Sequence, residues 1–440
     1  RLHGTLNSAF AITMDSVTKT HALGGDTPAH RDETYDCDGA AAGAPELSDE
    51  MALRIAQLSD PNHSIAAFAA QYLFERSHTS NPRAAENKDR IGRSGAILRI
   101  CRLMESEQEA ARFQACSALS ELAFCHEANC RAIISTPGCL EAVVTLLQPD
   151  NGTSQCDAAL IVNNCAAFCT DTCASIVHYP GMLAALQALA TGGNTSSKNV
   201  AVGALNSLTR CPSAGVRLAM LSAGVVEDTL SAVLAEEGQG DLYEARIARA
   251  AMGIANLQGE DEDAALGDGP NFTSAMATIC KIMRFALQEK SWAGIFFAPY
   301  SVCLPLNKLS RCEEHRHRLV SHGLVELMSE LLATWKPSHQ SNSTLLLALA
   351  ISHQLLVEPD CDDQRDRAEQ CGLLDNVVKT AEGARGENAD AVAAAEAIVS
   401  GLRERHQAVW MSQSARVGEG SMMHQLDDNV MELISRLAHV

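Results

Sequence analysis

The stretch Thr136-Pro137-Gly138-Cys139-Leu140 recurs without gaps as Arg93-Ser94-Gly95-Ala96-Ile97, Tyr179-Pro180-Gly181-Met182-Leu183 and Ser222-Ala223-Gly224-Val225-Val226. The four glycines are 43 residues apart each time. Looser copies follow at Gly269, Gly323 and Gly372. Self-similarity at a fixed period of this length is the sequence signature of a repeat array, in which one supersecondary unit is stacked many times.

Each glycine lies between two helical patterns. A small or apolar residue stands one helical turn before it, as Ile91 does before Gly95, and an apolar run such as 140–147 follows it. A second apolar run, such as 115–123, comes after a polar linker. A sharp turn between two packed helices favours glycine because glycine adopts positive φ without a steric penalty. Each unit is therefore predicted to be a short helix, a glycine corner, a helix, a loop and a third helix.

A three-helix unit of about 43 residues resembles the armadillo repeat family. The resemblance extends over residues 48–406. It implies an all-α fold, an armadillo-like right-handed superhelical solenoid (an α-α superhelix) of about seven to eight repeats. Ser48, ahead of two acidic residues, is the expected N-cap of the first helix. Residues 1–47 are predicted to be a flexible tail, and 407–440 a linker and an amphipathic C-terminal capping helix.

Charge and composition exclude several classes of protein. The 34 basic and 54 acidic residues give a net charge of -20, which repels nucleic acid. No apolar run approaches the roughly 18 to 20 residues of a membrane span. Cysteines such as Cys116 and Cys280 lie inside alanine-rich helical patterns and favour a reducing cytoplasm. A secreted alternative rests on five Asn-x-Ser/Thr triplets, at Asn62, Asn151, Asn194, Asn271 and Asn342.

The resemblance also implies a binding surface. In armadillo proteins the third helices line a concave groove, where a ladder of asparagines binds the backbone of an extended peptide, since an amide both donates and accepts. Only two asparagines occupy the aligned ladder positions, which are Glu121, Asn164, Ser207, Asn256 and Lys308. Asn163 and Asn206, one residue earlier, are alternative rungs. The competing interpretation is that all four asparagines are solvated or bonded locally.

A second candidate site is aromatic. Trp292, Phe296 and Tyr300 follow one another at intervals of four residues, which would place them on one face of a helix. Such a cluster could anchor a partner, because buried aromatic side chains carry much of the energy of an interface. Packing into the protein core is the alternative. Pro299 and Pro305 are expected to interrupt the helix.

Metal sites and catalytic sites are not predicted. Cys165, Cys169 and Cys173 share one face of a predicted helix, but paired zinc knuckles are absent from the sequence. We also find no phosphate-binding glycine loop, no Gly-x-Ser-x-Gly and no His-Glu-x-x-His. No enzyme activity, cofactor, metal or small-molecule substrate is therefore expected. Two acidic loops, 260–263 and 360–363, could attract a basic segment of a protein partner, or could simply be solvated.

The sequence thus predicts a scaffold or adaptor that binds a protein on the concave groove. The predicted groove residues are Asn163, Asn164, Asn206, Ser207 and Asn256, with Trp292, Phe296 and Tyr300 as a possible anchor. The alternative is a permanent structural subunit of a larger cytoskeletal, ciliary or chaperone assembly. An exposed polar groove favours the first function, and a continuous apolar stripe on an outer face favours the second.

Overall fold

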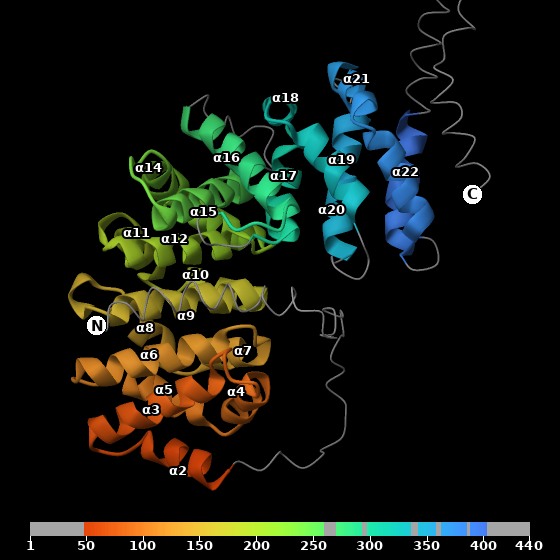
Figure 1. Cartoon of the computed structure of the whole chain (residues 1–440). Coiled ribbons are helices and arrows are strands. Elements are labelled where there is room, and N and C mark those ends of the chain that lie inside the picture. Colours follow the sequence, from red (N-terminus) through yellow and green to blue (C-terminus); the bar gives the residue numbers. More distant parts are fainter. Residues whose placement is uncertain are drawn as a thin grey trace, which may run out of the picture. The chain divides into compact units, whose positions relative to one another are not determined.

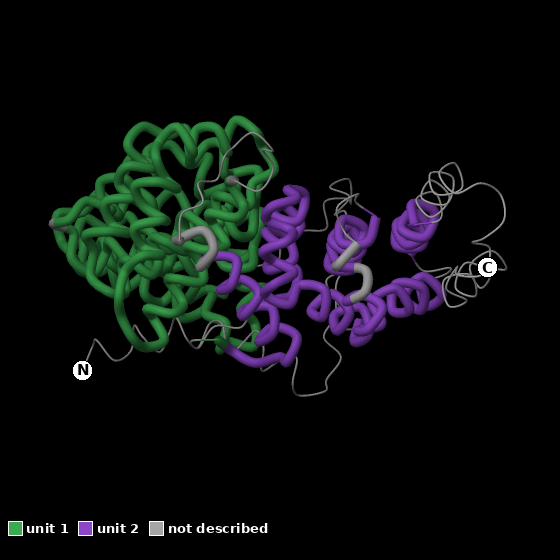
Figure 2. The backbone as a smooth tube through the Cα atoms, turned by 90° about the horizontal axis from the view of Figure 1, so that it is seen from above, with its two compact units in different colours: residues 1–27, 32–257, 292–296 green, residues 28–31, 258–291, 297–440 purple. Residues whose placement is uncertain are grey.

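Every regular element in the computed structural model is a helix over the residues that it describes, which are 48–258, 270–292, 297–335, 342–357, 362–384 and 388–402. The predicted all-α class is therefore confirmed (Figure 1). The predicted N-terminal tail, 1–47, and the predicted C-terminal segment, 407–440, lie outside the described residues. The described part forms two compact units, which we treat separately (Figure 2).

The first unit contains the strict copies of the repeat. It begins at α2, where the Ser48 side chain accepts a hydrogen bond from the Met51 amide (3.3 Å), so the predicted N-cap is confirmed. Its helices are α2 (Asp49–Gln57), α3 (His63–Ser77), α4 (Ala84–Arg93), α5 (Ala96–Leu103), α6 (Glu109–Ala123), α7 (Glu127–Ser135), α8 (Cys139–Leu146), η1 (Pro149–Asn151), α9 (Ser154–Phe168), η2 (Thr170–Thr172), α10 (Cys173–Val177), α11 (Met182–Gly192), α12 (Thr195–Thr209), α13 (Ala214–Ser222), η3 (Val225–Leu230), α14 (Ser231–Leu234) and α15 (Asp241–Gln258).

The glycine corners have the predicted conformation. Gly138 is the N-cap of α8 and has φ 81°, and Gly95 stands at the N-terminus of α5 with φ 78°. The corners at Gly181, Gly224, Gly323 and Gly372 also have positive φ. A side chain at this φ would crowd its own carbonyl, which explains why glycine marks the repeat. The Gly269 corner lies outside the described residues.

The third helices of successive repeats pack directly on one another. In Figure 1, α3, α6, α9 and α12 lie side by side in chain order. Their core positions, such as Leu119, Val162 and Leu205, are fully buried. Small residues let these backbones approach closely: a Cβ on Gly203 would stand 3.4 Å from the Asn163 side chain. This contact between third helices places the predicted groove residues next to one another.

One predicted helix is broken. Cys165 lies in α9, Cys169 is its C-cap, and Cys173 opens α10 after a bend of 119° between the two segments. The prediction that these three thiols share one helical face is therefore wrong, although all three are buried. Two other thiols contact this region, because the Cys130 thiol donates to the Asn164 carbonyl (3.9 Å) and the Cys211 thiol to the Thr170 carbonyl (3.8 Å). These contacts join neighbouring repeats.

The second unit continues the pattern with longer connections. Its helices are α16 (Pro270–Leu287), α17 (Pro299–Leu309), α18 (Glu313–Ser321), α19 (Leu324–Thr334), α20 (Asn342–Leu356), α21 (Asp362–Gln370), α22 (Leu373–Ala384) and a last helix over 389–402. Pro299 is at the first turn of α17, where a missing amide costs nothing, and Pro305 is buried inside the same helix. Pro305 therefore does not interrupt α17 as predicted, whereas Pro299 stands where the helix begins.

No single described helix is long and apolar enough to cross a membrane. One bent pair, α9 followed by residues 170–177, reaches the required length and composition. Both of its segments contribute buried residues to the core of the first unit.

Candidate functional site: the polar ladder of the third helices

The predicted groove residues form a chain of hydrogen bonds across three helices. The Asn164 amide of α9 donates to the Ser120 carbonyl of α6 (2.9 Å). Asn163 donates to the Asn164 side-chain oxygen (3.2 Å) and accepts from the Ser207 hydroxyl of α12 (3.0 Å). We call Asn163, Asn164, Asn206, Ser207 and Asn256 the polar ladder.

The ladder continues from α12 to α15. The Asn256 amide donates to the Thr209 hydroxyl (3.1 Å), which donates in turn to the Asn206 carbonyl (2.7 Å). The Asn206 side-chain oxygen is buried, and among the described residues it has no hydrogen-bond partner. An unsatisfied buried acceptor is costly, and this oxygen lies below the surface that an external donor can reach.

The first aligned rung is a charge pair and not an amide. The Glu121 carboxylate of α6 accepts from the Lys88 ammonium of α4 (2.9 Å), and both side chains are buried. Lys88 also donates to the Phe124 carbonyl (2.8 Å) and stands over the Phe124 ring. This buried ion pair joins the first and third helices of one repeat, and it takes the place of the asparagine at this rung.

The last aligned rung, Lys308, lies in α17 and is half-buried. Its neighbour Asn307 is the buried polar residue, and the Gln354 amide of α20 donates to it (3.4 Å). Ser310 also donates to the Gln354 side chain. The second unit therefore has polar contacts between its own third helices, one residue before the predicted position.

Basic side chains of α15 adjoin the ladder. Arg249 is buried and donates to the Asn199 side-chain oxygen of α12 (2.9 Å), and burial lowers the pKa of its guanidinium to about 10. Arg246 pairs with Glu236 (2.6 Å), which also accepts from Lys198 (3.2 Å). These cations are held by groups of this chain, and they link α12 to α15.

One buried carboxylate lies among the third helices. Asp157 of α9 accepts a hydrogen bond from the Ser117 hydroxyl of α6. Burial raises its carboxyl pKa from 3.8 to about 6, and the Ser117 hydrogen bond partly opposes the shift. Near pH 7 the Asp157 carboxyl is therefore mostly ionised, and the contact between α6 and α9 contains a buried negative charge.

The aromatic residues do not form the predicted helical face. Trp292 lies outside any helix, and α17 begins only at Pro299, so a single face of one helix is excluded. Trp292 is 6% exposed, and its indole N–H donates to Glu244 of α15 (2.5 Å). Tyr300, in α17, is 41% exposed. Phe296 lies outside the described residues.

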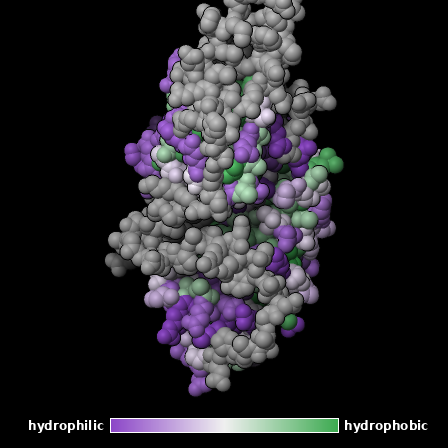
Figure 3. All heavy atoms as spheres, turned by 90° about the vertical axis from the view of Figure 1, so that its right-hand side faces the viewer, coloured by the Kyte–Doolittle hydropathy of each residue, from purple (hydrophilic) through white to green (hydrophobic). Residues whose placement is uncertain are grey.

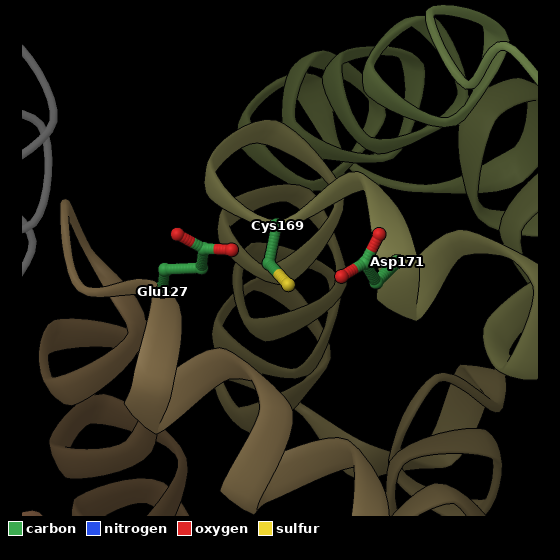
Figure 4. Close-up of side chains that lie close together, drawn as sticks. All are labelled: Glu127, Cys169 and Asp171. Atoms are coloured by element: carbon green, nitrogen blue, oxygen red, sulfur yellow. The ribbon is translucent and has the colours of Figure 1, made fainter. Parts of the chain in front are cut away.

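One cluster contains residue types that can bind metal ions. Glu127, Cys169 and Asp171 have ligand atoms within 4.8 Å of one another, and Figure 4 shows the two carboxylates on either side of the thiol. The Arg131 guanidinium pairs with both carboxylates, at 3.1 Å for Asp171. The two carboxylates therefore already share one positive charge, and a metal ion would have to displace this cation.

Sequence reasoning identified the rungs but not their partners. Ser120, Asn199 and Thr209 each accept a hydrogen bond from the following third helix. These pairs are separated by 44, 50 and 47 residues. Polar residues that recur at about one repeat length inside apolar helices were the available signal. The two acidic loops of the sequence lie outside the described residues, except for the start of α21.

Comparisons with known proteins agree with this arrangement. Residues 84–124, which comprise α4, α5 and α6, match the family model of the armadillo/beta-catenin-like repeat. A solved structure concerned with a phosphorylation switch in the interaction between cadherin and beta-catenin shares 16% identity and a TM-score of 0.51. The match covers 80% of this chain and 60% of that one.

Two engineered proteins from the Northeast Structural Genomics Consortium also match in structure. They share 19% and 17% identity, with TM-scores of 0.44 and 0.40. Each match covers 70% of this chain, and 97% and 99% of the engineered proteins. No curated protein matches the sequence. The glycine corners, the stacked third helices and the matched repeat lead to one conclusion: residues 84–124 form an armadillo repeat, and the chain has the fold of an armadillo-type helical solenoid.

Proposed function

We propose that the chain is a cytoplasmic scaffold that binds a protein partner on the third helices of its first unit. The observation that carries this proposal is Asn163, the half-buried rung of α9, whose side chain accepts from the Ser207 hydroxyl and donates to the Asn164 side-chain oxygen. These two bonds hold its amide in one orientation. Rungs that are fixed in place bind an extended backbone with little further loss of entropy.

The partner is proposed to carry a basic segment. A net charge of -20 attracts cations at long range and accelerates their encounter with the protein. Near the ladder, Arg246 and Lys198 share the Glu236 carboxylate, and the Arg249 guanidinium donates to Asn199, so these cations are held by groups of the chain. The ladder itself provides uncharged donors and acceptors. Charge would therefore guide the approach, and the amides would bind the backbone.

A non-catalytic role and a cytoplasmic location complete the proposal. The armadillo fold typically serves in protein association and not in catalysis. All 14 cysteines in the described ranges are free thiols, and most are buried, as suits a reducing compartment. Burial raises the pKa of thiols such as Cys303 to about 12, so they pack as small apolar groups.

The test is affinity capture from a cell lysate with the full chain and two variants. The first variant carries Asn163→Ala and Asn206→Ala in the ladder. The second carries Asn376→Ala, which removes an amide that donates to the Ser329 carbonyl between α19 and α22 (3.1 Å). A partner that is lost only with the ladder variant, at unchanged helical circular dichroism, supports the proposal. A partner that both variants retain contradicts it, and so does recovery only within a large stable assembly, which would favour a permanent structural subunit.

A further inference from the structure

The outer face of α3 carries exposed apolar side chains among polar ones, and only α2 covers it among the described helices, with the Arg54 guanidinium over the Phe68 ring at 4.8 Å. Three of the six large hydrophobic side chains exposed in the described part belong to these helices: Leu53 is 54% exposed, Ile65 36% and Phe68 53%. By contrast, α4 presents ion pairs, Glu86 with Arg90 and Asp89 with Arg93. Figure 3, which views the right-hand side of Figure 1, shows hydrophilic side chains gathered at the height of α4. The end of a repeat array is normally polar or capped, so the apolar face of α3 calls for an occupant.

The corresponding face of an interior third helix is buried against the preceding one. Helices α3 and α6 both have 15 residues, and α9 follows α6 at the 43-residue period. Phe68 and Glu75 of α3 then correspond to Asp157 and Asn164 of α9. Asp157 bonds to Ser117 of α6, and Asn164 bonds to the Ser120 carbonyl of α6. Helix α3 therefore presents the surface on which a preceding third helix would pack.

The chain contains a matching third-helix sequence upstream of α2. Gly4-Thr5-Leu6-Asn7-Ser8 repeats Gly203-Ala204-Leu205-Asn206-Ser207 of α12 at four of five positions. Leu2, Leu6, Phe10 and Met14 follow at intervals of four residues, which is the spacing of one helical face. We propose that residues 2–14, which lie outside the described part, pack on the outer face of α3 as the third helix of a preceding repeat.

The alignment of the interior third helices predicts which residues of 2–14 would face which residues of α3. Ser117 and Ser120 of α6 correspond, two periods later, to Gly203 and Asn206 of α12, and hence to Gly4 and Asn7. Gly4 would then lie opposite the Phe68 ring, where the absent side chain leaves room. The interior of the array uses the same device, because Gly203 faces the Arg249 guanidinium at 3.5 Å from its would-be Cβ.

Polar groups match in the same register. Asn7 would lie opposite Glu75, an exposed carboxylate that now accepts only from Gln71 of its own helix (3.0 Å) among the described residues. An amide N–H donated to a carboxylate is a strong hydrogen bond, and it fixes the direction of the segment. The contact is independent of the polar ladder, because it uses the opposite end of the stack of third helices from Asn256.

The test is hydrogen exchange, read by mass spectrometry, on the 440-residue chain and three variants. We expect amides 5–12 to exchange at least about ten-fold more slowly than an unstructured peptide. Phe68→Glu should abolish this protection. Leu218→Glu, on a side chain of α13 that is 66% exposed, should leave it unchanged. Gly4→Trp should also abolish it without touching the solenoid, which keeps the test valid if Phe68→Glu fails to fold.

Three results would overturn the assignment. Amides 5–12 that exchange freely in the unmodified chain would show that the segment does not dock. Protection that disappears on dilution, together with a dimer mass in light scattering, would assign the α3 face to a second copy of the chain. Protection that survives both Phe68→Glu and Gly4→Trp would place the segment elsewhere and would equally contradict the proposal.

Discussion

Replacing Asp157 by asparagine should stabilise the protein at neutral pH. The side chain is buried between α9 and α6, and its carboxyl pKa rises from 3.8 to about 6. A shift of roughly two units corresponds to about 3 kcal/mol at 1.36 kcal/mol per unit. The asparagine side chain would keep an oxygen for the Ser117 hydroxyl and would carry no charge. We expect Asp157→Asn to raise the free energy of unfolding by up to about 3 kcal/mol near pH 7.

The pH dependence has a definite sign. Because the folded pKa lies above the unfolded one, the folded chain binds the proton more tightly, and its stability falls as the pH rises through the folded pKa. The advantage of the variant should be absent below about pH 4, grow between about pH 4 and 6, and level off above about pH 7. The matched control is Asp171→Asn, which changes an exposed carboxylate.

The assay is urea unfolding followed by helical circular dichroism, at several pH values, for the unmodified chain and both variants. Only the transition that contains α9 is compared, because repeat arrays can unfold in more than one step. An advantage that does not change between about pH 4 and 7 would refute the reasoning. A loss of stability near pH 7 would show that the charge is compensated in the folded protein.

Three further changes test the account of the repeat. Gly138→Ala should cost about 1 to 2 kcal/mol in urea unfolding, because φ is 81° although the nearest atom leaves room at 3.5 Å. Gly192→Ala, at the last residue of α11 with open space around it and no positive φ, should instead add up to about 0.5 kcal/mol, and equal effects of the two would contradict the conformational argument. Lys88→Met should cost about 3 to 5 kcal/mol by stranding the buried Glu121 carboxylate, and adding Glu121→Leu should recover most of it in the same assay. No recovery in the double variant would show that the loss comes from packing and not from the charge.

Much of the fold could be predicted because its constraints are local and repeated. From α5 onwards, the second helix of each repeat begins after a glycine at positive φ in the described residues, except at α16. The corners could therefore be predicted from the regular spacing of these glycines. The N-cap at Ser48 could be predicted for the same reason, because its hydrogen bond joins residues only three positions apart. The break after Phe168 was missed because Cys165, Cys169 and Cys173 keep helical spacing through the bend.

The candidate site was predictable only in its positions. Alignment at the 43-residue period located Asn164 and Ser207. Their hydrogen bonds go to Ser120 and Asn163 of the preceding repeat, and the alignment does not predict these partners. The buried ion pair of Lys88 and Glu121 could not be predicted from the sequence, because its members are 33 positions apart and lie on α4 and α6, with α5 between them. Trp292 was placed on a helix by its spacing to Phe296, whereas it lies outside any described helix and its indole N–H donates to Glu244.

The central claim is that the third helices of the first unit form the surface that contacts a partner. Site-specific photocrosslinking in cells tests it most directly, with a benzophenone side chain introduced in place of half-buried Asn163 on α9 or exposed Leu218 on α13. The account predicts one discrete crosslinked protein from position 163 and none from position 218. Crosslinks from position 218 alone, or the same protein from both positions, would contradict it.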